Sequence, residues 1–384
     1  MANYNNHFDV IVLGVGGVGS SAMLELAKRG SNVLGIDRFS PGHDRGSSHG
    51  ITRIIRRSYF EHPDYVPLLN VAYQLWDELS ERENRRLMER TGLLYFGRES
   101  SPVIGGILNS AAQHNLQLER LPISEATKQF SAFVPPEGST VLFEPDAGYL
   151  LVEDCVKASV RAAEQMGATL SSGEEVISWD AGSNGVRVKT AHAIYEADKL
   201  LVTAGCWASG MVNGLDVPLR VVRKHLHWFE SNNSGLRQSE GCPCFFMEAF
   251  DGYFYGFPDF GGFGVKVAEH SGGLQIDDPL LDAREEEQAD TDRIRGFMRK
   301  HIPSAAARRT RHAVCYYTMS PDEHFIVDIH PEYDRVAFAA GLSGHGFKFA
   351  SALGKVLTEF SLDGTSKTDV DFLSLSRPSL RTES

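Results

Sequence analysis

The chain has 384 residues, of which 42% are hydrophobic and 23% charged, so it is long enough for two or three globular domains and too apolar to be disordered. Its 38 Lys and Arg against 50 Asp and Glu give a net charge of −12, which disfavours nucleic acid or an anionic membrane as the main partner. The five scattered cysteines do not form a disulfide framework pattern, and no Cys or His spacing fits a metal site.

Nothing in the sequence marks the protein for export or for a membrane. Residues 1–7 lack the basic and apolar pattern of a signal peptide. No apolar run approaches the roughly 20 residues that span a bilayer. We therefore expect a cytoplasmic protein.

The first 40 residues have the pattern of a dinucleotide-binding unit. Residues 8–13 form a short β-branched apolar run, which is typical of a strand buried on both faces. A glycine-rich turn follows at residues 14–19, and then a helix is predicted over 20–29 and a second strand over 32–36. A strand, a glycine turn, a helix and a second strand in this order predict a Rossmann-like unit.

Each glycine of this turn has a separate physical reason. Gly14 permits the tight turn, Gly16 lets a pyrophosphate approach the backbone, and Gly19 lets the helix pack closely on the strand. The amino end of the helix directs amide hydrogens and a partial positive charge at the phosphates. Asp37, 18 residues after Gly19, stands where an acid receives the ribose hydroxyls of a dinucleotide.

Beyond residue 40 the regular alternation of strand and helix is lost. Apolar periodicity predicts helices over residues 65–90, 148–167, 284–301 and 347–360. Further strands are predicted over 168–170, 199–205 and 335–340. Residues 218–267 are aromatic and read as a mostly antiparallel sheet, and the acidic residues 285–287 are expected to form a solvated first helical turn.

Several cationic side chains are not needed by such a fold. Arg53 and Arg56 are three residues apart, so on a helix they would share one face and could meet one ligand. Lys266 and His270 follow the aromatic sheet. Lys348 opens the last helix, where a lysine opposes the helix dipole unless both share an anion. This local conflict indicates function.

Four segments together resemble the monomeric sarcosine oxidase and N-methyltryptophan oxidase family of FAD-dependent amine oxidases. They are residues 14–19 with Asp37, 46–56 (GSSHGITRIIR), 315–325 (CYYTMSPDEHF) and 343–348 (SGHGFK). The resemblance runs from about Phe8 to Pro378. It implies an α/β (α+β) fold in which a Rossmann-like FAD-binding domain is interleaved with a mostly antiparallel-sheet substrate domain. The expected boundaries are 1–85, 146–217 and 320–384 for the FAD domain, and 86–145 and 218–319 for the substrate domain.

The resemblance also implies roles for single residues. In the FAD site, Cys315 matches the cysteine that bonds covalently to the flavin, and Arg53 matches the arginine that assists this attachment. The full implied FAD site is Gly14, Gly16, Gly17, Gly19, Asp37, Arg38, Ser47, Ser48, Arg53, Val176, Ala204, Gly205, Trp207, Cys315, Gly344, Gly346 and Lys348. The implied catalytic residues are Lys266, which promotes oxygen reduction, Arg53, His270 and Tyr255. The implied substrate cavity has Arg56 and Lys348 on the carboxylate, with Tyr255, His270, Tyr317 and Phe246 around it.

The implied reaction is oxidation of a small secondary amine that carries a carboxylate, such as sarcosine or another N-methyl amino acid. The C–N bond becomes an imine, and O2 is reduced to H2O2. Cations beside the amine favour its neutral form, so we expect deprotonation by electrostatic bias without a dedicated base. The resemblance implies a monomer. Many members of the family have two histidines in the segment that here reads Ser47, Ser48 and His49. Phe246 stands where the family commonly has methionine, so the substrate need not be sarcosine.

Several alternatives stay open at this point. Related families oxidise cyclic imino acids, such as pipecolate or proline, and fructosyl amino acids. A dehydrogenase that uses another electron acceptor is a further alternative. The alternative from another class is a flavin-binding protein without turnover.

Overall fold

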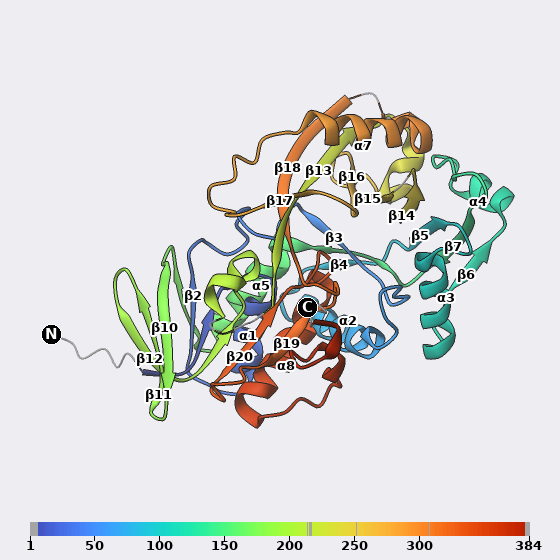
Figure 1. Cartoon of the computed structure of the whole chain (residues 1–384). Coiled ribbons are helices and arrows are strands. Elements are labelled where there is room, and N and C mark those ends of the chain that lie inside the picture. The colour runs from blue at the N-terminus through green and yellow to red at the C-terminus, as the bar shows by residue number, and fades with distance from the viewer. Residues whose placement is uncertain (1–6, 213, 215–216, 251, 307, 381–384) are drawn as a thin grey trace.

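The computed structural model describes residues 7–380 apart from 213, 215–216, 251 and 307. Residues 1–6, on which most of the signal-peptide argument rests, lie outside the described residues. Two large sheets form two parts of the molecule, joined by long strands and connections that cross between them (Figure 1). Among the described helices, none combines the length and the hydropathy needed to cross a membrane.

The first sheet contains the dinucleotide-binding unit that residues 8–40 predict. Its parallel strands have the order β9, β2, β1, β12, β20. They are β1 (His7–Leu13), β2 (Val33–Asp37), β9 (Thr169–Ser172), β12 (Ile194–Val202) and β20 (Val336–Ala340). The sheet is extended by antiparallel pairing of β10 (Val176–Gly182), β11 (Gly185–Thr190) and β19 (Ile326–Ile329).

Strand β1 is buried on both faces, as its apolar run predicts. Val10 and Val12 pack in the core that contains α1 (Gly17–Lys28), α5 (Val152–Gln165) and α8 (Ala350–Asp363). Ile11 and Leu13 pack in a second core on the opposite face. The alternation fixes the register of the strand, since a slip of one residue would exchange the two faces. The carboxyl end of β1 is thereby held against the amino end of α1.

The second sheet is mostly antiparallel, as predicted, because only β14 and β5 pair in parallel. Its order is β17, β13, β16, β15, β14, β5, β7, β6, and β18 pairs with β13. The strands are β5 (Leu93–Gly97), β6 (Glu119–Leu121), β7 (Thr140–Glu144), β13 (Arg220–Glu230), β14 (Cys244–Ala249), β15 (Gly252–Phe257), β16 (Val265–Glu269), β17 (Leu274–Ile276) and β18 (Arg308–Met319).

The two faces of this second sheet have different partners. Phe245, Phe254 and Val267 pack with helix α7 (Gln288–His301) on one face. The residues that alternate with them, including Phe246 and Tyr255, belong to a separate core on the other face. Because side chains alternate along a strand, this second face also receives Lys266, Cys315 and Tyr317.

A small third sheet corrects two expectations about helices. It consists of β3 (Thr52–Ile55), β8 (Gly148–Leu151) and β4 (Met88–Glu89). Arg53 therefore lies on a strand, not on a helix with Arg56. The predicted helix over 148–167 begins only at Val152, because residues 148–151 pair with β3 and a side chain at Gly148 would meet the Glu89 carbonyl at 1.9 Å.

Two other predicted helices have different ends. The helix expected over 65–90 is α2 (Tyr65–Arg82), and residues 88–89 belong to β4. The remaining helices are α3 (Pro102–His114), α4 (Ile123–Gln129) and α6 (Ala208–Met211). The helix expected over 284–301 begins at Gln288, so residues 285–287 are not its first turn. Glu286 pairs with Arg309, and Glu287 pairs with Arg223, so these carboxylates anchor the connection to β18 and β13 while they stay in contact with solvent, as predicted.

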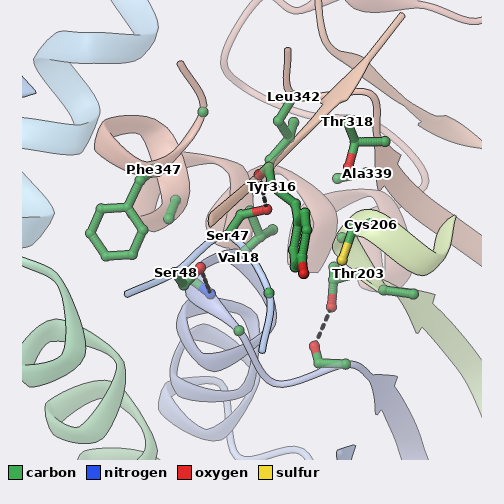
Figure 2. Close-up of a pocket in the computed structure, with 18 of the residues that line it drawn as sticks. Val18, Ser47, Ser48, Thr203, Cys206, Tyr316, Thr318, Ala339, Leu342 and Phe347 are labelled. Carbon is green, nitrogen blue, oxygen red and sulfur yellow. Dashed lines mark hydrogen bonds between the residues drawn. The ribbon is translucent and has the colours of Figure 1, made fainter. Parts of the chain in front are cut away.

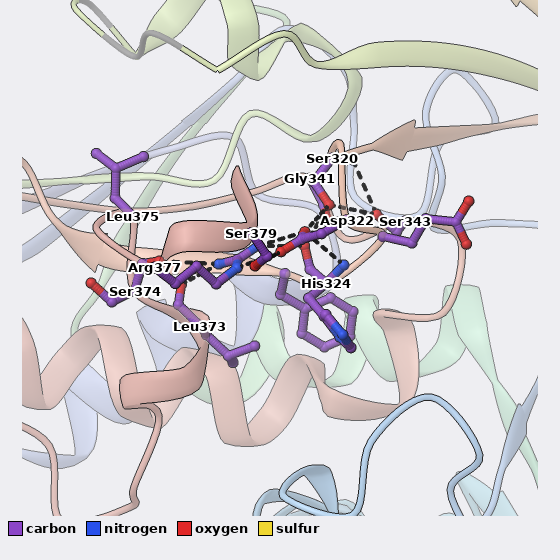
Figure 3. Close-up of polar contacts among 12 residues, drawn as sticks. Ser320, Asp322, His324, Gly341, Ser343, Leu373, Ser374, Leu375, Arg377 and Ser379 are labelled. Atoms are coloured by element: carbon purple, nitrogen blue, oxygen red, sulfur yellow. Dashed lines mark hydrogen bonds and ion pairs between the residues drawn. The ribbon is translucent and has the colours of Figure 1, made fainter. Parts of the chain in front are cut away.

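The carboxyl-terminal segment is tied to the glycine loop at residues 341–346 by a polar network (Figure 3). Arg377 donates from Nε and Nη2 to the two carboxylate oxygens of Asp322, at 2.7 and 2.9 Å. Burial opposes the charge on Asp322, but Arg377 and Ser379 hold the pKa of its carboxyl well below the usual value. Ser320 Oγ donates to Asp322 Oδ1 at 3.2 Å, and the Ser320 amide donates to Ser343 Oγ at 3.1 Å. This network holds the loop that leads into α8.

Candidate active site

A cavity lies between the first sheet and the second, and it collects most of the predicted site residues. Its lining includes Gly14, Gly16, Gly17, Asp37, Arg38, Ser47, Ser48, Arg53, Arg56, Val176, Ala204, Gly205, Trp207, Phe246, Tyr255, His270, Tyr317, Gly344, Gly346 and Lys348. Three predicted residues, Gly19, Lys266 and Cys315, do not line it. The predicted roles remain predictions, but the cavity brings together residues that lie far apart in the chain.

The glycine turn gives one end of the cavity its shape. Gly14 has φ +88°, and a side chain there would meet the Thr203 carbonyl oxygen at 2.7 Å. Gly19 points away from the cavity, and a Cβ on it would lie 1.9 Å from the Gly14 carbonyl oxygen. Gly19 therefore serves the close contact of turn and helix, as its place in the motif predicts. Gly16 and Gly17 line the cavity at the amino end of α1.

Asp37 ends β2 at the same edge of the sheet. Its two carboxylate oxygens accept the amides of Val15 at 2.7 Å and Phe39 at 2.8 Å, which fixes the side chain beside the glycine turn. Burial raises the pKa of Asp37, and the two amides and His43 oppose this effect. Each oxygen keeps a lone pair for a ligand hydroxyl. Arg38 pairs with Glu175 close by.

The middle of the cavity is drawn in Figure 2. Ser48 Oγ accepts the amide of Gly17 at 3.1 Å, and Ser47 Oγ donates to the carbonyl oxygen of Tyr316 at 2.6 Å. Trp207 Nε1 is buried in the cavity wall, and no acceptor for its N–H lies among the described residues. A buried donor without a partner is costly, so it indicates a polar ligand that supplies the acceptor.

These observations are a test of whether FAD fits the cavity. A strand and glycine turn, the amino end of a helix and a carboxylate at the end of the next strand are the groups that bind a dinucleotide, and the indole N–H of Trp207 offers a further donor. The residues present therefore fit FAD.

A cationic cluster lies at the junction of β3, β16 and β18. Arg53 Nη2 donates to the Ser47 carbonyl oxygen at 2.8 Å. Burial opposes the charge on Arg53, but Cys315 and nearby tyrosines raise the pKa of its guanidinium. Lys266 Nζ donates to the carbonyl oxygens of Gly50 at 2.7 Å and Thr52 at 2.8 Å. Burial and Arg53 hold the pKa of Lys266 well below its ordinary value.

Two further cations lie close to one tyrosine ring. The Arg56 guanidinium carbon lies 4.5 Å from the centre of the Tyr59 ring, and Lys348 Nζ lies 5.2 Å from it. Arg56 Nη2 donates to both carboxylate oxygens of Glu61, at 2.8 and 2.9 Å. Lys348 donates to the His345 carbonyl oxygen at 2.8 Å. Burial and Arg56 lower the pKa of Lys348 to about 7.

The polar groups across the cavity come from the second sheet. The hydroxyls of Tyr255 and Tyr317 share a hydrogen bond, and His270 Nδ1 lies 3.4 Å from Tyr317 Oη. Phe246 lies beside them, with its ring centre 6.2 Å from that of His270. A small molecule with an anionic end fits between these groups and the cations at Tyr59.

The sequence did not single out Phe60, Glu61 or His345, which also line the cavity. Phe60 contacts both the Arg56 guanidinium, at 4.3 Å from the ring centre, and Phe246, at 5.4 Å between ring centres. The only available signal for Glu61 was an acid five residues after an arginine, which is too common to identify a pair. His345 stood within a recognised motif but had no role of its own.

Helix α3 packs closely against the loop that carries Phe60, and this contact gives a first testable prediction. A Cβ at Gly106 would lie 2.4 Å from the Phe60 carbonyl oxygen, whereas one at Gly105 has no atom within 4 Å. We expect Gly106→Ala to lower the free energy of unfolding by about 1–3 kcal/mol. Gly105→Ala should raise it by about 0.5–1 kcal/mol, because alanine is the better helix former. Urea denaturation of both variants measures the difference, and equal changes in the free energy of unfolding would contradict the close contact at Gly106.

Comparison with known proteins agrees with this geometry. Residues 9–360 match the family described as DAO, FAD dependent oxidoreductase. The chain belongs to this family. It is 39% identical over 382 residues to a monomeric sarcosine oxidase of Bacillus sp. (strain B-0618), covering 98% of each chain. It is 36% identical over 372 residues to an N-methyl-L-tryptophan oxidase of Yersinia pestis (strain Pestoides F), covering 96% of this chain and 99% of the relative.

A solved structure supports the fold. NikD, an unusual amino acid oxidase, superposes with a TM-score of 0.83 at 22% identity, over 96% of this chain and 97% of that one. The resemblance stated from the sequence motifs, the fold class and the FAD-dependent oxidoreductase activity are therefore confirmed. The residue roles, the domain boundaries and the covalent flavin bond stay predictions.

Proposed function

We propose that this member of the DAO family is an oxidase of a small secondary amine that carries a carboxylate, with sarcosine or another N-methyl amino acid as the substrate. The observation that carries the proposal is the placement of Arg56 and Lys348 on one tyrosine, in the cavity that also holds the dinucleotide-binding turn. The names of the relatives support the same substrate class.

Residues of the cavity have two proposed roles, which are to bind the substrate and to influence the protonation of its amine. Arg56 and Lys348 would hold the substrate carboxylate, and Tyr255, His270 and Tyr317 would surround the amine. The nearby cations disfavour an ammonium, so the bound amine gives up its proton more easily. Glu61 is the carboxylate beside Arg56 and Lys348. Both of its oxygens already accept hydrogen bonds from Arg56, so we assign Glu61 no role as a base.

FAD would be held by the glycine turn, Asp37, Ser47, Ser48 and the loop at 341–346, and when bound it supplies the two-electron acceptor. In the overall reaction the amine loses two electrons and two protons to become an imine, and O2 takes them up as H2O2. We propose that Lys266 favours this use of O2, since it is buried on the sheet face that carries Tyr255. The monomeric state and the cytoplasmic location expected from the sequence also remain predictions.

The experiment that tests the function is anaerobic bleaching of the flavin absorbance by a panel of amines. The panel contains N-methyl amino acids, the cyclic imino acids pipecolate and proline, and fructosyl amino acids. We expect rapid bleaching by N-methyl amino acids, and recovery with formation of H2O2 when air is admitted. Bleaching by only one of the other classes would replace the substrate assignment. No bleaching by any amine, in a flavin that dithionite still reduces, would favour a flavin-binding protein without turnover.

We propose that the covalent bond to the flavin forms at Cys315, and Cys206 offers a matched control. Arg53 lies close enough to Cys315 for the two groups to interact electrostatically, so a fixed cation is present at the proposed attachment site. Cys206 lines the cavity itself, is also buried, and lacks this role in the proposal. After acid precipitation we expect the yellow colour in the pellet of the wild type and of Cys206→Ala, and in the supernatant of Cys315→Ala. Colour in the Cys315→Ala pellet would refute attachment at this residue.

A further inference from the structure

Lys224 is a buried cation behind the wall of the substrate cavity. It lies in the middle of β13, 4% exposed, directly opposite Cys315 in the pairing of β13 with β18. Its position two residues from Val222 and Leu226, which belong to the core of that sheet face, places it on the side that carries Tyr317. A lysine in a buried apolar strand needs an explanation, because burial of its charge is costly.

The ammonium of Lys224 makes contacts that join two elements. Nζ donates to the main-chain carbonyl oxygens of Ser271 at 2.6 Å and Gly272 at 3.0 Å. It also lies 5.5 Å from the centre of the Tyr317 ring. The turn after β16 is thereby attached to the strand pair of β13 and β18. Close packing supports this contact, since a Cβ at Gly273 would lie 3.1 Å from the Lys224 side chain.

His270 is the first residue of the turn that Lys224 holds. The amide of His270 donates to the Tyr253 carbonyl oxygen at 2.7 Å, and Ser271 Oγ accepts the Tyr253 amide at 3.0 Å. With its backbone fixed in this way, the His270 ring reaches Tyr317 Oη at 3.4 Å. Lys224 therefore contacts the turn on one side of this hydrogen bond and the tyrosine ring on the other.

Burial disfavours the charged form of both side chains. Burial lowers the pKa of Lys224 to about 8, against the raising effect of Glu269, Cys315 and Asp290, while Arg293 lowers it further. Burial, and after it Lys224, lowers the pKa of His270 to about 3. The other charged or titratable groups that face His270 are Glu61, His345, Lys348 and the tyrosines 255 and 317. Lys224 is thus the first of the charges that keep this imidazole neutral.

We propose that Lys224 is a positioning residue for the amine oxidation proposed above: it fixes the turn of His270 against Tyr317, and its positive charge adds to burial in disfavouring a charged His270 ring. A neutral imidazole has one nitrogen that accepts a hydrogen bond, whereas an imidazolium has none. The neutral ring can therefore accept the Tyr317 hydroxyl or the N–H of the substrate. An imidazolium would instead compete with the substrate amine for the same position. The inference rests on the proposed function only for its kinetic consequence.

Three variants separate the charge of Lys224 from its hydrogen bonds. Lys224→Gln removes the charge and keeps a donor, Lys224→Met removes both, and Lys224→Arg keeps both. For Lys224→Gln and Lys224→Met we expect the acidic limb of the pH profile of flavin reduction to move up by about 1 pH unit. Lys224→Met should also raise KM by about tenfold, the cost of one charged hydrogen bond. Lys224→Arg should restore both.

A second measurement is independent of turnover. In protein labelled with 15N-histidine, the His270 signal, assigned by its loss in His270→Asn, should titrate at least about 1 pH unit higher in Lys224→Gln than in the wild type. An unchanged His270 titration in Lys224→Gln would overturn the inference, even if rates fall. A wild-type flavin that no amine bleaches would instead contradict the proposed function, and the histidine titration would still decide the role of Lys224.

Discussion

Replacing Arg56 by methionine is expected to lower kcat/KM for an N-methyl amino acid by about 10³-fold. Removal of one partner from a buried, hydrogen-bonded charge pair costs about 2–5 kcal/mol, and about 4 kcal/mol corresponds to this factor. Arg56 is 4% exposed and lies against the Tyr59 and Phe60 rings, so water cannot replace its charge. Methionine keeps much of the length of the side chain, so the loss reports the guanidinium rather than a cavity.

A substitution of Glu61 is the matched variant, and its expected effect on substrate binding is opposite to that of Arg56→Met. The two carboxylate oxygens of Glu61 accept hydrogen bonds from the Arg56 guanidinium at 2.8 and 2.9 Å. Burial opposes the charge on Arg56, but Glu61 raises the pKa of Arg56 above its ordinary value. A substrate carboxylate must share or displace this partner. Glu61→Gln keeps the shape and removes the competing charge, so we expect KM to fall by up to about tenfold.

Steady-state oxygen consumption measures both variants, and thermal unfolding of the holoenzyme controls for stability. If Arg56→Met lowers kcat and leaves KM unchanged, Arg56 acts on the chemical step and does not bind the substrate carboxylate. An amine without a carboxylate provides the internal control. Its kcat/KM should change little in Arg56→Met, and an equal loss for this amine would contradict the assigned role.

The second large effect is a pH dependence of carboxylate binding through Lys348. Its pKa of about 7 in the free protein means that the ammonium is present below pH 7 and is lost as the pH rises through this value. For a simple carboxylate that cannot be oxidised, such as acetate, the Kd should rise about tenfold per pH unit above 7, and by about 10² between pH 6 and 9. Acetate has no ionisation of its own in this range.

Perturbation of the flavin spectrum measures this Kd, and Lys348→Met is the control. The variant should bind acetate weakly and with no dependence on pH between 6 and 9. A wild-type Kd that stays constant over this range would mean that Lys348 remains charged or does not contact the anion. The same slope in Lys348→Met would assign the ionisation to another group.

Local sequence was sufficient where one segment makes its own contacts. The strand, glycine turn and helix over residues 8–29 are fixed by a two-sided apolar run and by Gly14 and Gly19, whose requirements are local. The motifs around Arg53, Cys315 and Lys348 were likewise readable as short, specific strings. Twenty of the predicted site residues line the cavity, and many of them belong to these short motifs.

Periodicity failed where a partner strand decided the conformation. Residues 148–151 have the composition of a helix start, yet they pair with β3, and Gly148 allows the close approach of Glu89. Arg53 joined a strand for the same reason. The acidic run at 285–287 forms ion pairs with Arg309 and Arg223, which lie on other strands and could not be identified from local charge.

The sequence by itself determined the dinucleotide unit, the family and the chemical types of the site residues, because these depend on short motifs. Only the tertiary structure decided that Glu61 holds Arg56 and that Lys224 reaches the turn of His270. It also decided that Lys266 and Cys315 are buried and do not line the cavity. Lys224 and Ser271 are 47 residues apart, and their contact depends on the register of β13 with its neighbours. Such contacts follow from the packing of whole sheets, for which a single sequence contains no local signal.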